Sequence, residues 1–233
     1  MVDVAIVDYG MGNLRSVEQA LRHVAPEADI LVTDDAAVIE QAGRVIFPGQ
    51  GAMPDCMREL DARGLRSAVI DAAKNKPFLG ICIGLQMLFE HSAEGDVAGL
   101  SVLQGEVLRF PGNMQDAHGH KLKVPHMGWN EVHHVGRASA RHVGLKPDLQ
   151  SIGVAPVNEH PMWEGIAQDA RFYYVHSYYV KPADATLIQA TSDYPQAFVC
   201  AVASENLFAV QFHPEKSQAA GLKLLHNFVQ WNP

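Results

Sequence analysis

The sequence is poor in cysteine, in basic residues and in long apolar runs, and each shortage excludes a class of protein. Three cysteines among 233 residues are too few for a disulfide framework, so reduced thiols in a cytosol are expected. A net charge of -8 without a long basic stretch disfavours nucleic acid as a partner. No apolar segment reaches the roughly 20 residues that cross a membrane, and residues 1–8 lack the basic start of a signal peptide. We expect a soluble, cytoplasmic protein that binds neither nucleic acid nor membrane.

The first part of the chain alternates short apolar runs with amphipathic stretches. The apolar runs are 2–7, 30–32, 44–47 and the run before Cys82, and the helical patterns are 13–23, 34–42, 53–62 and 65–73. Asn13 is suited to cap the first helix. This alternation predicts an α/β fold with a doubly wound, largely parallel sheet, whose functional groups gather at the carboxyl ends of the strands.

The second half of the chain is richer in strands than in helices. Strands are predicted at 102–110, 131–135, 171–180, 187–191, 197–203 and 207–212. They indicate an antiparallel extension of the sheet, closed by an amphipathic helix over 217–231. Residues 111–120 and 137–161 are predicted to be long loops of unassigned function. No linker or repeat divides the chain, so we expect one domain over 1–233.

Residues 77–90 combine an apolar run with a glycine-flanked cysteine. The run 77–81 has the length of a buried strand, and a stretch of good helix formers reaching Glu90 follows Gly-x-Cys82-x-Gly. A cysteine on a sharp strand-to-helix turn needs neighbours without bulk, and a helix start beside it favours the thiolate. We therefore predict a nucleophile elbow at Cys82. Cys56 and Cys200 are interpreted as small buried apolar residues.

Another apolar run, 208–212, ends in His213, Pro214 and Glu215. Residues two apart on an extended chain lie on the same side, so His213 and Glu215 can share a face. Pro214 suits the end of a strand. A carboxylate beside an imidazole fixes its tautomer, and the imidazole then takes the proton of a thiol. Cys82, His213 and Glu215 are thus a candidate catalytic triad.

Glycines also follow the apolar run 44–47, at Gly49 and Gly51 on either side of Gln50. Such residues let the backbone approach a ligand closely, and N–H groups here and at Ile83 would stabilise the oxyanion of a tetrahedral intermediate. An ordinary strand-to-helix turn is the alternative interpretation.

The remaining histidines are not interpreted as metal ligands, and no metal or cofactor is predicted. Six of them lie in loop-like sequence without a paired cysteine or a fixed helical spacing. These six are expected to be solvated: His118, His120, His126, His133, His134 and His142.

The chain carries, in this order, Pro-Gly-x-Gly at 48–51, the segment 80–86 and the terminal His-Pro-Glu at 213–215. Together these motifs resemble those of the class I (triad) glutamine amidotransferases. The resemblance covers nearly the whole chain. Residues 8–17, 125–130 and 213–217 further resemble the branch formed by the glutaminase subunits of imidazole glycerol phosphate synthase, an enzyme of histidine biosynthesis. The carbamoyl-phosphate, anthranilate and GMP synthase branches are expected to carry a histidine before Gln86, where this chain has Leu85.

The resemblance implies that Cys82 attacks glutamine and forms a glutamyl thioester, that His213 shuttles protons, and that Glu215 orients His213. It implies that the amino-acid end of glutamine is held by Gln86 and by the backbone near Ser177 and Tyr178.

The resemblance also implies a partner, a separate (β/α)8-barrel cyclase in a heterodimer. Ammonia from glutamine is expected to pass to this cyclase, which makes imidazole glycerol phosphate and an aminoimidazole carboxamide ribotide. Candidate contact residues around the mouth of the site are Asn13, Met127, Trp129, Asn130, Tyr173 and Lys216, although simple packing is an alternative for Met127 and Trp129.

Two departures from the family and three rival functions stay open. The chain is longer than typical members, with the loops 111–120 and 137–161 as the expected excess. The family more often has valine at the position of Gln50, in a peptide thought to reorient when the partner binds, so activity without the partner is undetermined. The rivals are an amidotransferase subunit of another synthase, a non-catalytic binding module, and a cysteine peptidase or esterase. Gln86 and the glycines of 48–51 disfavour the last of these.

Overall fold

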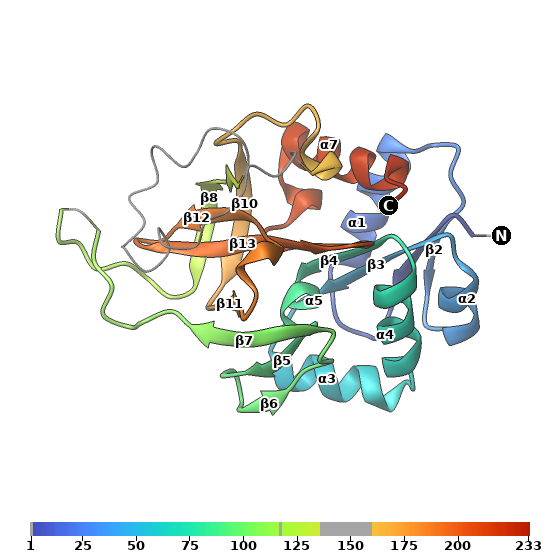
Figure 1. Ribbon diagram of the computed structural model, residues 1–233, viewed down its shortest axis with the longest axis horizontal. Coiled ribbons are helices and arrows are strands. Elements are labelled where there is room, and N and C mark those ends of the chain that lie inside the picture. The colour runs from blue at the N-terminus through green and yellow to red at the C-terminus, as the bar shows by residue number, and fades with distance from the viewer. Residues whose placement is uncertain (1, 117, 136–159) are drawn as a thin grey trace.

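The alternating first part of the chain forms parallel strands in a computed structural model that describes residues 2–116, 118–135 and 160–233 (Figure 1). The strands are β1 (Val4–Val7), β2 (Ile30–Thr33), β3 (Arg44–Gly49) and β4 (Phe78–Cys82). They lie in the order β2-β1-β3-β4, and all three pairings are parallel. Every residue of β1 and β4 is buried, as expected for parallel strands covered on both faces.

Helices cover both faces of this sheet. Figure 1 shows α1 (Leu14–Val24) and α7 (Gln218–Gln230) together on one face, and α2 (Ala36–Gln41), α3 (Met53–Ala62) and α4 (Arg66–Asn75) on the other. Helix α1 buries Val17, Ala20 and Leu21 on one stripe, and this apolar spacing explains which side of the helix packs on the sheet. Asn13 stands at its N-cap, but its side chain makes no capping hydrogen bond.

The second half extends the sheet with antiparallel strands. β14 (Leu207–Val210) pairs parallel with β4, and β13 (Ala197–Ser204), β11 (Tyr178–Pro182) and β7 (Leu103–Arg109) continue antiparallel. Beyond β7 lie β5 (Phe89–Ser92) and β6 (Val97–Ala98), while β12 (Ile188–Asp193) pairs with β13 and with β9 (His133–His134). The predicted fold class, a doubly wound and largely parallel sheet with an antiparallel extension, is confirmed.

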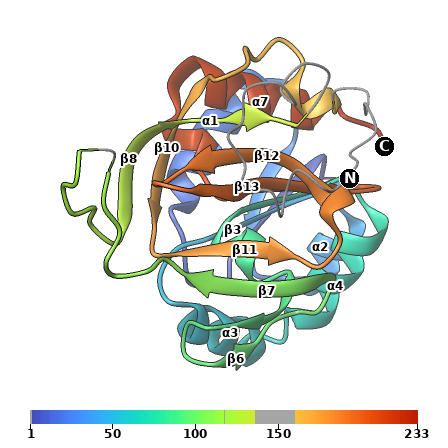
Figure 2. The same cartoon turned by 60° about the vertical axis from the view of Figure 1, so that its left-hand side comes forward.

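A two-stranded antiparallel ribbon stands apart from this sheet. It consists of β8 (His126–Glu131) and β10 (Arg171–His176), and Figure 2 shows it running across the direction of β11, β12 and β13. Short 3-10 turns lie at η2 (Pro161–Trp163), η3 (Ala185–Leu187) and η4 (Pro214–Lys216). The ribbon and η4 both border the predicted triad.

Several predicted boundaries are wrong. The helix expected after Cys82 is only α5 (Ile83–Gln86), because every residue from 83 to 89 is buried and a longer amphipathic helix would have no face toward solvent. The chain then continues into β5. The strand predicted at 131–135 is displaced to β8 and β9, and the one at 171–180 is two strands separated at Ser177. The predicted loop at 137–161 lies mostly outside the described residues.

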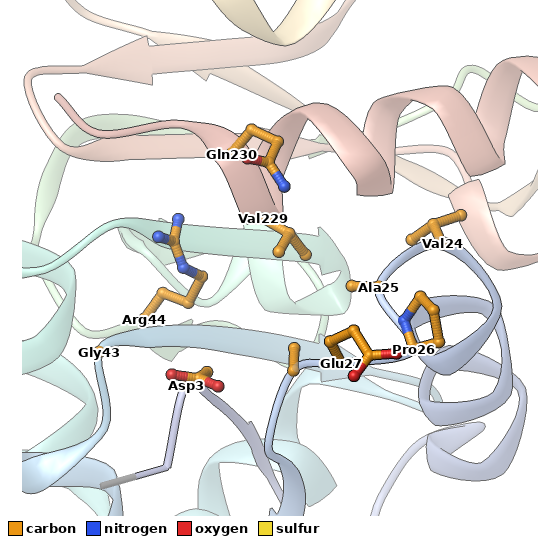
Figure 3. A pocket seen from close by; sticks show the side chains of 10 residues that line it. Asp3, Val24, Ala25, Pro26, Glu27, Gly43, Arg44, Val229 and Gln230 are labelled. Carbon is orange, nitrogen blue, oxygen red and sulfur yellow. The ribbon is translucent and has the colours of Figure 1, made fainter.

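The amino ends of the strands carry a hollow remote from the predicted triad. Figure 3 shows Asp3, Arg44 and Val229 around it, with the turn after α1 on the other side. Arg44 Nη1 donates to the carbonyls of Phe228 at 2.9 Å and Trp231 at 2.7 Å, fastening the end of α7 to β3. Burial lowers the pKa of Arg44, and Asp3 opposes this effect. Because these hydrogen bonds join two elements, we interpret the hollow as a structural joint.

Within the described residues, no helix combines the length and the apolar character needed to cross a membrane.

Candidate active site

Cys82 ends β4 in a strained backbone conformation beside the end of β3. Its φ of 57° and ψ of -110° lie in a region that residues with a side chain rarely adopt. It is paired in register with Gly49 of β3. A Cβ atom at Gly84 would overlap the carbonyl oxygen of Phe47, and one at Gly80 would come within 3.0 Å of the Ala209 Cβ. Gly84 is therefore required for the sharp turn, and a side chain at Gly80 would crowd the neighbouring strand.

His213 and Glu215 form a buried pair just beyond β14, the strand next to β4. The imidazole Nδ1 and the Glu215 Oε1 are 2.9 Å apart, and the two side chains are 4% and 1% exposed. The Nε2 atom of His213 is buried and makes no hydrogen bond of ordinary geometry within the described part of the chain. This leaves the second ring nitrogen available for a reacting group.

The charge on His213 depends on Cys82. Burial alone would lower the pKa of His213, but the sulfur of Cys82 and then the carboxylate of Glu215 outweigh burial and raise that pKa to about 10. The imidazole therefore binds a proton readily when the sulfur is a thiolate. Sequence reasoning predicted this juxtaposition of Cys82, His213 and Glu215, and the structure brings the three together.

Hydrogen bonds to the ribbon hold the segment that carries His213. Its backbone N–H donates to the Tyr173 carbonyl at 2.9 Å. The hydroxyl of Ser217 donates to the His213 carbonyl at 2.6 Å and accepts from the Tyr173 N–H at 3.0 Å. The backbone that carries the imidazole is thus tied to β10 as well as to β14.

The predicted oxyanion segment lies directly beside the elbow. Gly49 is buried, whereas Gln50 and Gly51 are exposed, and Gly51 has a φ of 121° that favours glycine. A Cβ at Gly49 would come within 2.5 Å of the Tyr9 hydroxyl. The thiol of Cys56 donates to the Gln50 carbonyl at 3.8 Å. Burial raises the pKa of Cys56 to about 11, so this thiol keeps its proton at neutral pH.

Gln86 is the last residue of α5 and lies deep in the structure, 1% exposed. Its amide nitrogen donates to the Tyr178 carbonyl at 3.2 Å and to the Gln211 Oε1 at 2.9 Å. The carbonyl of Ser177 is occupied by the N–H of Phe110 at 3.0 Å. Gln86 and Tyr178 are therefore brought together, but their hydrogen bonds are made within the chain.

Gln211 is a site residue that sequence reasoning missed. It is fully buried, and its amide nitrogen donates to the Cys82 sulfur at 3.6 Å. The available signal was a lone polar side chain inside the apolar run 208–212, since a buried amide requires hydrogen-bond partners.

Most of the predicted partner-contact residues share one surface. Met127 is 62% exposed and Trp129 is 38% exposed. The Trp129 ring lies 6.1 Å from that of Tyr173, and the Lys216 ammonium lies 6.0 Å from the Tyr173 ring centre. We call Met127, Trp129, Tyr173 and Lys216 the ribbon patch.

The other two predicted contact residues make polar contacts outside this patch. Asn130 extends from the opposite side of β8, because side chains alternate along a strand, and it donates to the Asp193 carbonyl at 2.8 Å. Asn13, at the start of α1, accepts a hydrogen bond from the Ser16 hydroxyl at 3.0 Å.

The expectation of six solvated loop histidines is wrong for two of them. His126 is 4% exposed and His134 is 2% exposed, because β8 and β9 place them inside. His126 Nδ1 lies 3.0 Å from His176 Nε2, and burial lowers the pKa of His126 to about 4 and that of His176 to about 3. His133 is half-buried and pairs with Asp169 at 2.7 Å. His118 and His120 are exposed as predicted, and His142 lies outside the described residues.

A family model described as glutamine amidotransferase class-I matches residues 5–231. The chain belongs to the class I glutamine amidotransferase family. Within this enzyme family it is 61% identical to a protein of Nitrosospira multiformis and 60% identical to one of Aromatoleum aromaticum, over 100% of each chain in both cases. Both are named imidazole glycerol phosphate synthase subunit HisH.

Solved structures agree with this amidotransferase fold. A structure titled glutamine amidotransferase has a TM-score of 0.65 at 15% identity, covering 97% of each chain. The structure of PurLQS from Thermotoga maritima has a TM-score of 0.62 at 16% identity and covers 98% of this chain and 97% of that one. At such low identity these likenesses show the fold alone.

Proposed function

We propose that this chain hydrolyses glutamine to glutamate and ammonia as the glutaminase subunit of an imidazole glycerol phosphate synthase in histidine biosynthesis. The observation that carries the proposal is the juxtaposition of Cys82, on its strained turn, with the buried pair of His213 and Glu215 at the end of the neighbouring strand. The names of the two HisH relatives, each aligned over its whole length, support the choice of synthase.

The reaction begins when the Cys82 thiolate attacks the carboxamide carbon of glutamine. The imidazolium of His213, held by Glu215, donates its proton to the departing nitrogen, and ammonia leaves as the glutamyl thioester forms. A water molecule then adds to the thioester carbon while His213 takes its proton. The carbon–sulfur bond breaks, glutamate leaves, and Cys82 is regenerated. The raised pKa of His213 suits it to carry a proton beside a thiolate.

The negative oxygen of each tetrahedral intermediate needs fixed donors. The N–H of Ile83, directly after the sulfur-bearing residue, supplies one. The backbone of Gly49, Gln50 and Gly51 supplies the other, and the freedom of the two glycines allows this peptide to turn. The Cys56 thiol donates to the Gln50 carbonyl and therefore favours the present orientation of the peptide between Gln50 and Gly51.

The side-chain oxygen of Gln86, which has no hydrogen-bond partner among the described residues, and the backbone at Ser177 and Tyr178 hold the amino-acid end of glutamine. Cys82 is only 4% exposed, so the segments that cover it must move before glutamine reaches the sulfur. We therefore infer that the chain alone hydrolyses glutamine slowly and that the partner with its nucleotide ligand accelerates it.

The partner is a (β/α)8-barrel cyclase that receives the ammonia and makes imidazole glycerol phosphate and an aminoimidazole carboxamide ribotide in the cytoplasm. It contacts the ribbon patch, with Asn13 at the rim, while residues 1–233 act as one domain. An exposed methionine and an exposed tryptophan beside each other are typical of a protein interface. The link from Tyr173 to His213 gives this surface a direct connection with the triad.

The test compares two nitrogen sources in the assembled complex. Cys82→Ser should abolish synthesis with glutamine and leave synthesis with ammonium salts intact, because only the cyclase is needed for the latter. Cys200→Ala is the matched control, a buried thiol without a place in the mechanism, and should retain both activities. Glutamine-dependent synthesis that survived Cys82→Ser would refute the proposal. Recovery of a different synthase with the purified chain would instead favour another branch of the family.

A further inference from the structure

Gln211 occupies a position that the proposed reaction does not yet explain. It is fully buried at the end of β14, and its side-chain nitrogen donates to the Cys82 sulfur at 3.6 Å. An amide buried at this depth costs free energy unless its donors and acceptor are used. Apart from the triad histidine, it is the side chain with the most direct polar contact to the sulfur among the described residues.

The direction of this contact is set by a chain of hydrogen bonds. A backbone carbonyl only accepts, so Gln86 must present its NH2 group to Tyr178. The same nitrogen donates its second hydrogen to the Gln211 Oε1 at 2.9 Å. With its oxygen occupied in this way, Gln211 is left with its nitrogen toward the sulfur. We call this chain of hydrogen bonds the relay. In it Gln86 donates to Tyr178 and to Gln211, and Gln211 donates to Cys82.

The carbonyl at the far end of the relay is fixed as well. His176 Nδ1 lies 2.8 Å from the Tyr178 carbonyl oxygen and must donate to it. Burial lowers the pKa of His176 to about 3, so this ring is neutral and its Nε2 accepts from His126, which lies 3.0 Å away. None of these groups changes charge near neutral pH, and the relay keeps one polarity.

We propose that Gln211 is a positioning residue for the nucleophile: its N–H, fixed by Gln86, orients the Cys82 sulfur and stabilises its thiolate. This inference rests on the proposed function, since it concerns the same sulfur. A hydrogen bond to a charged acceptor is roughly twice as strong as one to a neutral acceptor, so Gln211 favours the thiolate over the thiol. A donor separate from His213 also holds the sulfur in place while the imidazole gives its proton to the leaving nitrogen.

Alkylation of Cys82 by iodoacetamide tests this role without requiring glutamine. The thiolate sulfur bonds to the reagent's methylene carbon and iodide leaves, so the rate follows the thiolate fraction. Cys56 and Cys200 are insensitive near neutral pH, because burial raises the pKa of their thiols to about 11 and about 12. Peptide mass spectrometry on the full-length chain measures the rate at Cys82 as a function of pH. The ratio of the rate one pH unit below the midpoint of the native profile to the plateau rate at high pH cancels differences in access.

Gln211→Met, which keeps the length and removes the donor, should lower this ratio about tenfold, as expected for the loss of one charge-assisted hydrogen bond. Gln211→Glu should lower it further, since a carboxylate repels the thiolate. Gln86→Leu leaves Gln211 intact but unanchored and should shift the ratio in the same direction by a smaller factor. Because Gln86→Leu leaves Gln211 in place, this variant keeps the test decisive if the Gln211 variants do not fold.

Asn227→Leu is the matched control. It removes another buried amide, whose nitrogen donates to the carbonyls of Met162 at 3.0 Å and Glu164 at 2.8 Å, remote from Cys82. It should lower stability and leave the rate ratio unchanged. Unchanged ratios in Gln211→Met and Gln86→Leu would overturn the positioning role while leaving the proposed function intact. A glutamine chloroketone that labels a residue other than Cys82 would instead overturn the proposed function.

Discussion

Replacing Cys82 with alanine should lower the pKa of His213 by several pH units. The imidazole has a pKa of about 10 because the attraction of the Cys82 sulfur and of Glu215 outweighs the effect of burial. Alanine removes the larger of these two attractions and leaves the burial. The proton should therefore dissociate from His213 at a lower pH in Cys82→Ala than in the native chain.

Other histidines of the same molecule set the size of the expected change. Burial lowers the pKa of His126 and of His160 to about 4, and neither has a carboxylate within ion-pair distance among the described residues. A double variant, Cys82→Ala with Glu215→Gln, should bring His213 toward this value. The single variant, which keeps Glu215, should fall between about 4 and about 10.

The assay is an NMR titration of a chain labelled in its histidine rings, with His213 assigned by its absence in His213→Asn. Cys200→Ala serves as a control and should leave the titration unchanged. If His213 titrated at the same pH in the native chain and in Cys82→Ala, the sulfur and the imidazole would not interact, and the electrostatic argument for the triad would fail.

Arg44→Ala removes two charged hydrogen bonds to the end of α7 and should lower the free energy of unfolding by about 2 kcal/mol in urea titrations. An unchanged midpoint would contradict the structural joint between β3 and α7. Gly84→Ala drives a methyl group into the Phe47 carbonyl and should cost roughly 1–3 kcal/mol of stability together with glutaminase activity, whereas native activity would show that the elbow tolerates bulk. His126 and His176 have lowered pKa values, so the stability that they contribute is fully present above pH 6.5 and is lost as pH falls toward 4 and 3. In that window, each of these two histidines should lower the free energy of unfolding by at most about 1.4 kcal/mol per pH unit. His126→Gln should therefore lose less stability between pH 7 and pH 5 than the native chain does.

The parts of the site that local sequence could predict are those with local causes. Cys82 was predictable because two glycines flank a turn that brings the chain to a φ of 57°. His213 and Glu215 were predictable because an imidazole and a carboxylate flank a proline that ends the apolar run. The structure brings them together through the 3-10 turn η4 and not, as the alternation of side chains predicted, on an extended strand. The parallel sheet then brings both segments together, since β4 and β14 are neighbours whose carboxyl ends meet.

The parts that were missed depend on contacts between distant segments. In the sequence Gln211 is an isolated polar residue. Its role depends on the pairing of β4 with β14, which places Gln86 beside it. His126 was expected in a solvated loop because β8 is recognisable only through its pairing with β10, which turns His126 inward. The same alternation sends Asn130 away from the ribbon patch. Pairing partners and registers of such short strands are not written in the local pattern.

The most direct test of the account is to trap the covalent intermediate. In the complex with the cyclase and its nucleotide ligand, His213→Asn should slow hydrolysis of the thioester more than its formation, because water needs the imidazole as a base whereas the sulfur attacks as a thiolate. Rapid acid quenching after addition of glutamine should therefore leave one glutamyl group attached. Mass spectrometry should locate this group on the peptide that contains Cys82. A glutamyl group on Cys56 or Cys200, or glutamine turnover at the native rate in this variant, would contradict the account.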